Sequence, residues 1–267
     1  MQQLGAHSRT IVGVPSPANA PFVVEVAIDS VAGARDAVAN GASRLELCAG
    51  LELGGLTPSL GLLDAVRAAV QVPVFAIVRP RAGDFLYDRD EFAVMLRDAQ
   101  HLVAAGAHGL VTGALTAAGA IDAARLRELR AVAAALPFTC HRAFDLCVDG
   151  LRAIDDLVEL GVTRVLTSGA AATAVAGAAA IRAFVQRAAG RIVVMAGAGV
   201  RPENVRELVA TSGVREVHLS ASQRQPSAMQ FRRAGVPMGS AMATDEYSRR
   251  STDGALVARV VAALRDS

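Results

Sequence analysis

Short apolar runs alternate eight times along the chain with longer segments of helical periodicity. The apolar runs, which have the length and composition of β-strands, begin near Phe22, Arg44, Val74, Gly109, Phe138, Arg164, Ile192 and Glu216. The helical periodicity covers residues 30–40, 58–70, 89–105, 121–135, 150–160, 173–189, 202–211 and 254–265. Eight successive strand–helix units predict an α/β fold, a single (β/α)8 TIM barrel with its chemistry at the C-terminal ends of the strands.

The length of the chain suits one such domain. A barrel of this kind needs about 250 residues, and the chain has 267. We expect residues 22–267 to form the barrel and residues 1–21, which are rich in Gly, Ser and Pro, to be a disordered N-terminal tail. The apolar piece in this tail is shorter than the core of a secretory signal, and no run is long enough to span a membrane. The sequence therefore predicts a cytoplasmic protein without a membrane partner.

One connection is much longer than the others. Residues 222–253, between the eighth strand and the last helix, show little periodicity and contain several Arg and Met residues. Long connections without regular structure in compact domains are usually functional. Because this insertion starts at the mouth of the barrel, we expect it to cover a site there or to form a subunit contact in a homo-oligomer.

The composition excludes several classes of function. Hydrophobic residues make up 52% of the chain, as expected for parallel strands that are buried on both faces. The net charge is +2, the arginines are spread along the chain and aromatic residues are few, so nucleic acid is not an expected partner. All 27 basic residues are arginine. Without a lysine the chain cannot form a Schiff base, bind pyridoxal phosphate (PLP) covalently or build a Walker-type nucleotide site.

Ionisable side chains recur on the inward face of the predicted strands. Because alternate strand residues point into a barrel, Glu25, Glu46, Arg79, His141 and His218 should meet at its mouth. Buried ion pairs that stabilise the barrel are one interpretation. The other is a functional site, in which the carboxylates and imidazoles do general acid–base catalysis or bind a divalent metal. The sequence does not choose between these two chemistries.

The loop after the third strand carries candidate anion ligands. Arg79, Arg81 and Asp84 lie in a loop that also contains glycine. Two guanidinium groups on such a loop suit a carboxylate or a phosphate. We therefore predict that this loop binds the anionic part of a substrate.

The loops after the last two strands carry a second candidate. Gly197 and Gly199 follow the seventh strand, and Ser220 follows the eighth. Many barrels bind phosphate between these two loops and a helix N-terminus. The alternative is that the glycines only allow a tight turn between strand and helix.

Three cysteines, Cys48, Cys140 and Cys147, show no CxxC spacing and are expected to be free thiols in a reducing compartment. Cys48 should face into the barrel beside Glu46, whereas Cys140 precedes an inward residue and should face the helices. Whether one of these thiols binds a metal does not follow from their spacing.

Several segments, in register from about residue 22 to the C-terminus, resemble the CutC family. They are Glu46-Leu-Cys48, Gly54-Gly55-Leu-Thr-Pro58-Ser59, Arg79-Pro-Arg81-x-Gly83-Asp84-Phe85, Cys140-His141-Arg142-Ala-Phe144-Asp145, Leu166-Thr-Ser168-Gly169, Met195-Ala-Gly197-Ala-Gly199-Val200-Arg201 and Asp245-Glu246-Tyr247-Ser248. The resemblance implies a cytoplasmic, self-associating (β/α)8 barrel that is associated with copper handling and has no established reaction. It also implies a copper site on two cysteines of the first two strands. Cys48 matches the second position, so the resemblance makes Cys48 the candidate metal ligand, but Ala27 occupies the first position.

Two functions follow as hypotheses. The first is a copper homeostasis protein that binds copper weakly through Cys48, because copper(I) prefers sulfur ligands and a two-thiolate site cannot form here. The second is a TIM-barrel enzyme or binding protein for a small anionic metabolite, a phosphate or a carboxylate, which uses the inward Glu, His and Arg cluster. A scaffold that assembles through the long insertion is a third possibility.

Overall fold

A computed structural model describes residues 21–233, 235–236 and 245–265 of the chain. The predicted tail over residues 1–21 lies outside this part, except for its last residue. No helix in the described part is both long and apolar enough to cross a membrane.

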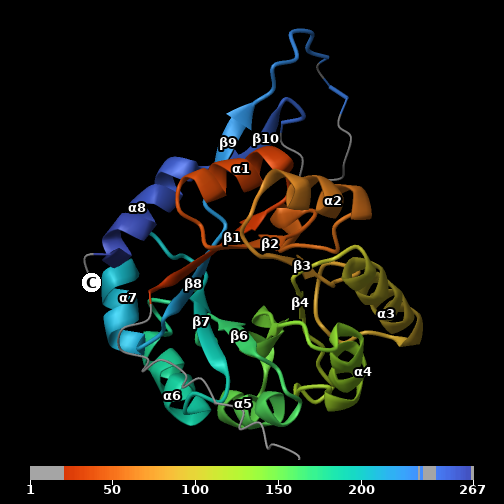
Figure 1. The fold of residues 1–267 in the computed structure, drawn as a ribbon, viewed down its shortest axis with the longest axis vertical. Helices are drawn as coiled ribbons and strands as arrows, with labels where there is room; N and C mark the ends of the chain where they lie inside the picture. The colour runs from red at the N-terminus through yellow and green to blue at the C-terminus, as the bar shows by residue number, and fades with distance from the viewer. Residues whose placement is uncertain (1–20, 234, 237–244, 266–267) are drawn as a thin grey trace, which may run out of the picture.

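Eight parallel strands close into a barrel in the order of the sequence, and the eighth pairs with the first. Figure 1 looks down into this ring, which the helices surround. The predicted fold class is therefore confirmed. The strands are β1 (Val23–Ile28), β2 (Arg44–Leu47), β3 (Val74–Ile77), β4 (Gly109–Thr112), β5 (Phe138–Cys140), β6 (Arg164–Thr167), β7 (Val193–Gly197) and β8 (Glu216–Leu219).

The helices lie close to their predicted positions. They are α1 (Val31–Ala39), α2 (Leu60–Ala69), α3 (Arg89–Ala104), α4 (Ala123–Ala133), α5 (Gly150–Glu159), α6 (Ala178–Ala188), α7 (Val205–Ser212) and α8 (Gly254–Arg265), with short 3-10 turns η2 (Leu51–Leu53) and η3 (Arg142–Leu146). The main difference is at α6, which begins five residues later than predicted. Its preceding segment is a turn in which the Thr173 hydroxyl accepts a hydrogen bond from the Ala176 amide.

Side chains that accept a hydrogen bond from a free amide mark where several helices begin. Ser30, Asp88 and Asp149 each accept a hydrogen bond from an amide of the first turn that follows. Caps of this kind stabilise a helix by about 1 kcal/mol each. They fix the turn from strand to helix at the end of the barrel where the site lies.

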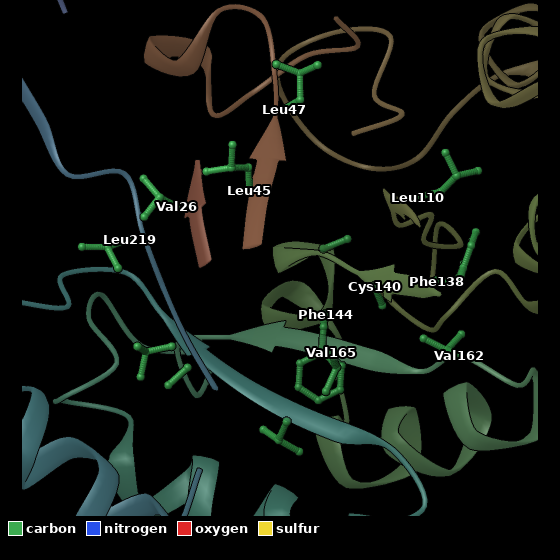
Figure 2. Packing of buried hydrophobic residues seen from close by; sticks show 14 of the residues in the cluster. Val26, Leu45, Leu47, Leu110, Phe138, Cys140, Phe144, Val162, Val165 and Leu219 are labelled. Carbon is green, nitrogen blue, oxygen red and sulfur yellow. The ribbon is translucent and has the colours of Figure 1, made fainter. Parts of the chain in front are cut away.

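Alternation along the strands separates two buried regions. Outward residues of the strands pack against the helices in one large apolar cluster, part of which Figure 2 shows with Val26, Leu45 and Val165 labelled. Inside the barrel the apolar cluster is small: Cys48, Phe75, Ile77 and Val111, with Leu51 against it. Polar and charged side chains, among them Glu25, Arg44 and Arg164, occupy much of the rest of the described interior.

The long insertion is partly a β-hairpin, which the sequence analysis did not predict. Strands β9 (Ser222–Pro226) and β10 (Ser248–Thr252) pair antiparallel and project outward beside α1 (Figure 1). Both faces of this ribbon carry Ser, Gln and Arg side chains that are largely exposed. Without a buried face there is no apolar alternation to reveal the strands. The role of the insertion as a cover or a subunit contact stays a prediction.

Candidate functional site

A cavity of about 410 Å³ opens at the C-terminal ends of the strands. Its volume is in the range of sites for small molecules. Its wall is formed by residues of β1, β2, β3, β6 and β8, of the segments that follow β2, β3, β5, β7 and β8, and of α8. They are Ala27, Glu46, Leu51, Gly54, Ile77, Arg79, Phe85, His141, Arg142, Leu166, Ala198, Gly199, Val200, Arg201, His218, Leu219, Ser220, Ala221, Ser222 and Leu256.

A layer of buried ion pairs lies deeper in the barrel. Arg44 donates to Glu25 through Nε and to Glu216 through a second nitrogen, at 2.5 Å. Arg164 bonds both oxygens of Glu216, at 2.5 and 3.1 Å. Two guanidinium groups are thus balanced by two carboxylates. These contacts match the interpretation of the inward charges as ion pairs that stabilise the barrel. That interpretation applies to Glu25 and also to Arg44, Arg164 and Glu216, which the sequence analysis had not selected.

Above this layer, Glu25, His218 and Glu46 form a chain that reaches the cavity. His218 Nδ1 lies 2.8 Å from Glu25 Oε1, and His218 Nε2 lies 3.8 Å from Glu46 Oε2. The register of the barrel brings them together, because Glu25 is opposite His218 in β8 and Ala27 is opposite Glu46 in β2. Glu25 is fully buried, whereas the other two line the cavity. Glu25 can therefore orient the imidazole so that Nε2 faces a ligand.

The electrostatics of this chain keep a proton available. Burial alone would raise the pKa of Glu25, but the hydrogen bond from His218 and the charge of Arg44 lower it to about 2. Burial raises the pKa of Glu46. Burial opposes the charge on His218, yet Glu46 and Glu25 outweigh it and raise the pKa of the imidazole. Glu25 is thus held ionised, while the pKa values of His218 and Glu46 are both raised, and such neighbouring titratable groups suit general acid–base catalysis.

The same three residues could hold a divalent cation. One ligand atom from each lies within 4.8 Å of the others. Carboxylate oxygens with one imidazole suit hard or borderline ions. Glu25, however, already accepts hydrogen bonds from Arg44 and His218, so a cation would compete with both. The geometry favours a proton on this chain over a metal.

His141 is a neutral hydrogen-bond donor in the cavity wall. Burial, with a smaller contribution from the charge of Arg79, lowers its pKa to about 3. Its Nδ1 accepts a hydrogen bond from the Ala143 amide at 3.2 Å, so the proton of the neutral ring lies on Nε2. That Nε2 is buried and has no partner among the described residues. Such a donor is costly to leave unpaired.

Gly113 makes room for this imidazole. A Cβ at Gly113 would lie 2.7 Å from His141 Nδ1, which is closer than real side chains approach. On another side, the Phe85 ring packs against His141 with centroids 4.8 Å apart. The orientation of His141 is thus determined by the end of β4 and by the loop after β3.

Arg79 combines a structural role with a place in the cavity wall. Its guanidinium donates to the carbonyl oxygens of Leu53 and Gly55 at 2.9 and 3.1 Å and to that of Gly83 at 3.0 Å. It also lies over the Phe85 ring, 5.1 Å from the centroid. It is 6% exposed, and no carboxylate of the described residues pairs with it. The guanidinium of Arg79 is therefore a buried positive charge beside the cavity without a carboxylate to balance it.

Arg81 and Asp84 do not line the cavity. Arg81 forms an ion pair with Glu91 of α3, contacts Asp84 at 3.2 Å and lies over the Tyr87 ring. The loop after β3 thus directs its two arginines to different places, and only Arg79 reaches the cavity wall. The second arginine ties the loop to the next helix.

The residues at the ends of β7 and β8 are only partly in the wall. Gly199, with a φ of +72°, and Ser220 line the cavity. Gly197 does not, and a Cβ there would lie 2.6 Å from Leu166 and 3.3 Å from the Cβ of His218. Gly197 therefore provides space for the side chains of Leu166 and His218, which line the cavity.

Cys48 lies apart from the other two thiols. Cys48 is buried inside the barrel and points to Glu46 Oε2, 3.5 Å away. Burial, followed by the charge of Glu46, raises its pKa well above the usual value. Cys140 and Cys147 belong to the shell between barrel and helices. Because copper(I) binds thiolates, a single protonated thiol does not fit a tight copper(I) site.

Sequence reasoning missed several residues of the site. Arg44, Arg164 and Glu216 each lie two positions before an inward residue of the cavity wall, so the same alternation could have found them. Arg142 and Arg201 also line the cavity. Arg142 begins the 3-10 turn η3 and Arg201 lies in the loop after β7, and in neither place does a strand period predict the direction of a side chain.

Comparisons with known proteins agree with this fold. Residues 22–223 match the model of the CutC family. The human copper homeostasis protein cutC homolog is 45% identical over 232 residues, 87% of this chain and 85% of that protein. A family protein CutC of Klebsiella pneumoniae is 48% identical, covering 89% and 96% of the two chains. The crystal structure named for the copper homeostasis protein CutC of Streptococcus agalactiae is 31% identical, with a TM-score of 0.72, and covers 74% and 98%.

Proposed function

The chain belongs to the CutC family, and from this premise we propose that it serves copper homeostasis by acting on a small anionic metabolite. In this proposal the barrel mouth binds the metabolite and the Glu25–His218–Glu46 chain moves a proton on it. The name of the human relative supports the link to copper. The three free cysteines suit a reducing compartment, and we propose a cytoplasmic location.

One observation carries the proposal: a carboxylate–imidazole–carboxylate chain faces a cavity whose wall also contains an unbalanced guanidinium. His218 Nε2 and Glu46 Oε2 are 3.8 Å apart at the cavity wall, and Glu25 holds the opposite side of the imidazole. Arg79 supplies the positive charge. An anion would balance Arg79 while the chain exchanges a proton with it. Groups with perturbed pKa values that converge in a cavity are typical of functional sites.

In this proposal copper is cargo rather than a resident cofactor. The described residues place one thiol in the barrel, and burial, followed by the charge of Glu46, raises the pKa of that thiol. Ala27 lies where the family resemblance has a second cysteine. A tight copper(I) site on thiolates is therefore not part of the proposal.

Thermal unfolding of the full chain with small carboxylates and phosphate esters tests the proposal. A ligand at 100 times its Kd stabilises the folded state by about 2.7 kcal/mol. We expect at least one such anion to raise the melting temperature of the wild type and to do so less in Arg79→Lys. An equal shift in both proteins would contradict the anion site.

A measurement of copper(I) retention separates the two hypotheses. We expect the reduced wild type and Cys48→Ser, which replaces a thiol with a hydroxyl of similar size, to retain equally little copper(I) against a moderate chelator. Clear retention by the wild type that Cys48→Ser loses would favour copper binding at Cys48 instead.

A further inference from the structure

The proton chain leaves part of the cavity wall without a role. The neutral imidazole of His141 has an Nε2–H group with no hydrogen-bond partner among the described residues. The residue is only 5% exposed, so water does not readily supply a partner either. Arg79 presents a buried charge without a carboxylate partner in the same part of the structure. Both line the cavity that His218 and Glu46 line, and the Phe85 ring contacts both.

This pairing has a specific chemical use. A neutral donor beside a positive charge stabilises an oxygen that becomes negative during a reaction. A neutral imidazole is better matched to this task than an imidazolium that would simply give up its proton. The hydrogen bond from the Ala143 amide to His141 Nδ1 and the tight fit against Gly113 hold the donor in place. The wall therefore offers an oxyanion site and a proton-transfer site in one cavity.

We propose that the substrate is a small carbonyl compound with a carboxylate or phosphate group, and that the site removes a proton from the carbon next to the carbonyl. The inference rests on the proposed function and names its substrate class. His218 Nε2 takes the proton, with Glu46 beside it and Glu25 opposite the imidazolium that forms. His141 Nε2–H donates to the oxygen, and Arg79 balances its charge.

The step balances without a co-reactant. The C–H bond breaks, its electron pair becomes a C=C bond, and the electron pair of the C=O π bond moves to the oxygen. The proton that His218 Nε2 has received returns to the same carbon, which restores the carbonyl and the imidazole. Where that carbon carries a hydroxyl group, the proton can instead return to the adjacent carbon while the hydroxyl proton passes to the enolate oxygen, and the carbonyl then forms on the first carbon. Abstraction and return of a proton in this way is an isomerisation or an exchange with solvent.

Binding of planar enolate mimics tests the oxyanion site. The probes are oxalate, which carries a carboxylate, and phosphoglycolohydroxamate, which carries a phosphate; sulfate and neutral oxamide are the controls. Titration calorimetry should show that at least one mimic binds more than about tenfold tighter than sulfate, because one well-placed hydrogen bond corresponds to about that factor. The preferred mimic distinguishes the two anionic groups.

Variants identify the donors. His141→Phe keeps a ring but removes the donor, and it should weaken binding of the mimic about tenfold. His141→Gln, whose amide can donate, should restore part of this loss. Equal affinity for mimic and sulfate, or an unchanged affinity in His141→Phe, would overturn the oxyanion site.

Proton exchange tests the chemistry. In D₂O, proton NMR should show faster loss of the carbon-bound proton of pyruvate or of dihydroxyacetone phosphate with the wild type than with His218→Gln. If the mimics bind but neither compound exchanges, the enolisation step is wrong and anion binding still stands. If neither the mimics nor any other small anion binds, the proposed function is wrong as well.

Discussion

Replacing Glu25 with Gln should separate the stability of the barrel from the properties of His218. The substitution keeps the size of the side chain but removes the negative charge that Arg44 and His218 share. Breaking a buried ion pair by removing one partner costs about 3–5 kcal/mol. Because Arg44 keeps its bond to Glu216 at 2.5 Å, we expect a loss near the lower limit, about 3 kcal/mol.

The loss translates into a measurable melting temperature. For a domain of this size each kcal/mol lowers the melting temperature by about 2–4 °C, so Glu25→Gln should melt about 6–12 °C below the wild type. Glu216→Gln is the matched control, because it removes the charge that Arg44 and Arg164 share but leaves His218 untouched. It should destabilise the barrel at least as much.

The two variants should differ in the titration of His218. Glu46 and Glu25 raise the pKa of this imidazole above its usual value of 6.5. Its pKa should therefore fall in Glu25→Gln and stay raised in Glu216→Gln. NMR titration of the ring proton, assigned from its absence in His218→Gln, measures this difference. An unchanged pKa in Glu25→Gln would refute the chain from Glu25 to His218 to Glu46.

Three further predictions concern copper, the oxyanion donor and pH. Ala27→Cys places a second inward thiol opposite Glu46, two residues before Cys48, so it should bind copper(I) at least tenfold tighter than the wild type in competition with a chelator. Gly113→Ala brings a methyl group 2.7 Å from His141 Nδ1, and calorimetry should show about tenfold weaker oxalate binding. Folding raises the pKa of His218 above 6.5. The stabilisation that this imidazole provides is therefore complete below pH 6.5 and is lost as the pH rises through the raised pKa. Urea unfolding at several pH values should show this decrease in the free energy of unfolding for the wild type and not for His218→Gln.

Most of the barrel could be predicted because one rule covers it. A buried parallel strand alternates between the interior and the helices, and each strand–helix unit repeats that pattern. The rule selected Glu25, Glu46 and His218, which the structure brings together. It also placed Arg79 and His141 in the cavity wall.

The rule fails where no period exists. Arg81 lies two residues after Arg79, but it is in a loop and pairs with Glu91 of the next helix. The hairpin of β9 and β10 has no buried face, so its strands leave no apolar pattern. The protonation of His141 was also beyond the sequence, because it depends on packing against Gly113, Phe85 and Ala143.

Crystals of the full chain, soaked separately in oxalate and in copper(I), test the central claim most directly. We expect density for oxalate in the barrel mouth, within hydrogen-bond distance of His141 Nε2 and beside His218, and no anomalous copper peak at Cys48. An empty mouth in the first soak, together with a strong copper peak on the Cys48 sulfur in the second, would contradict it.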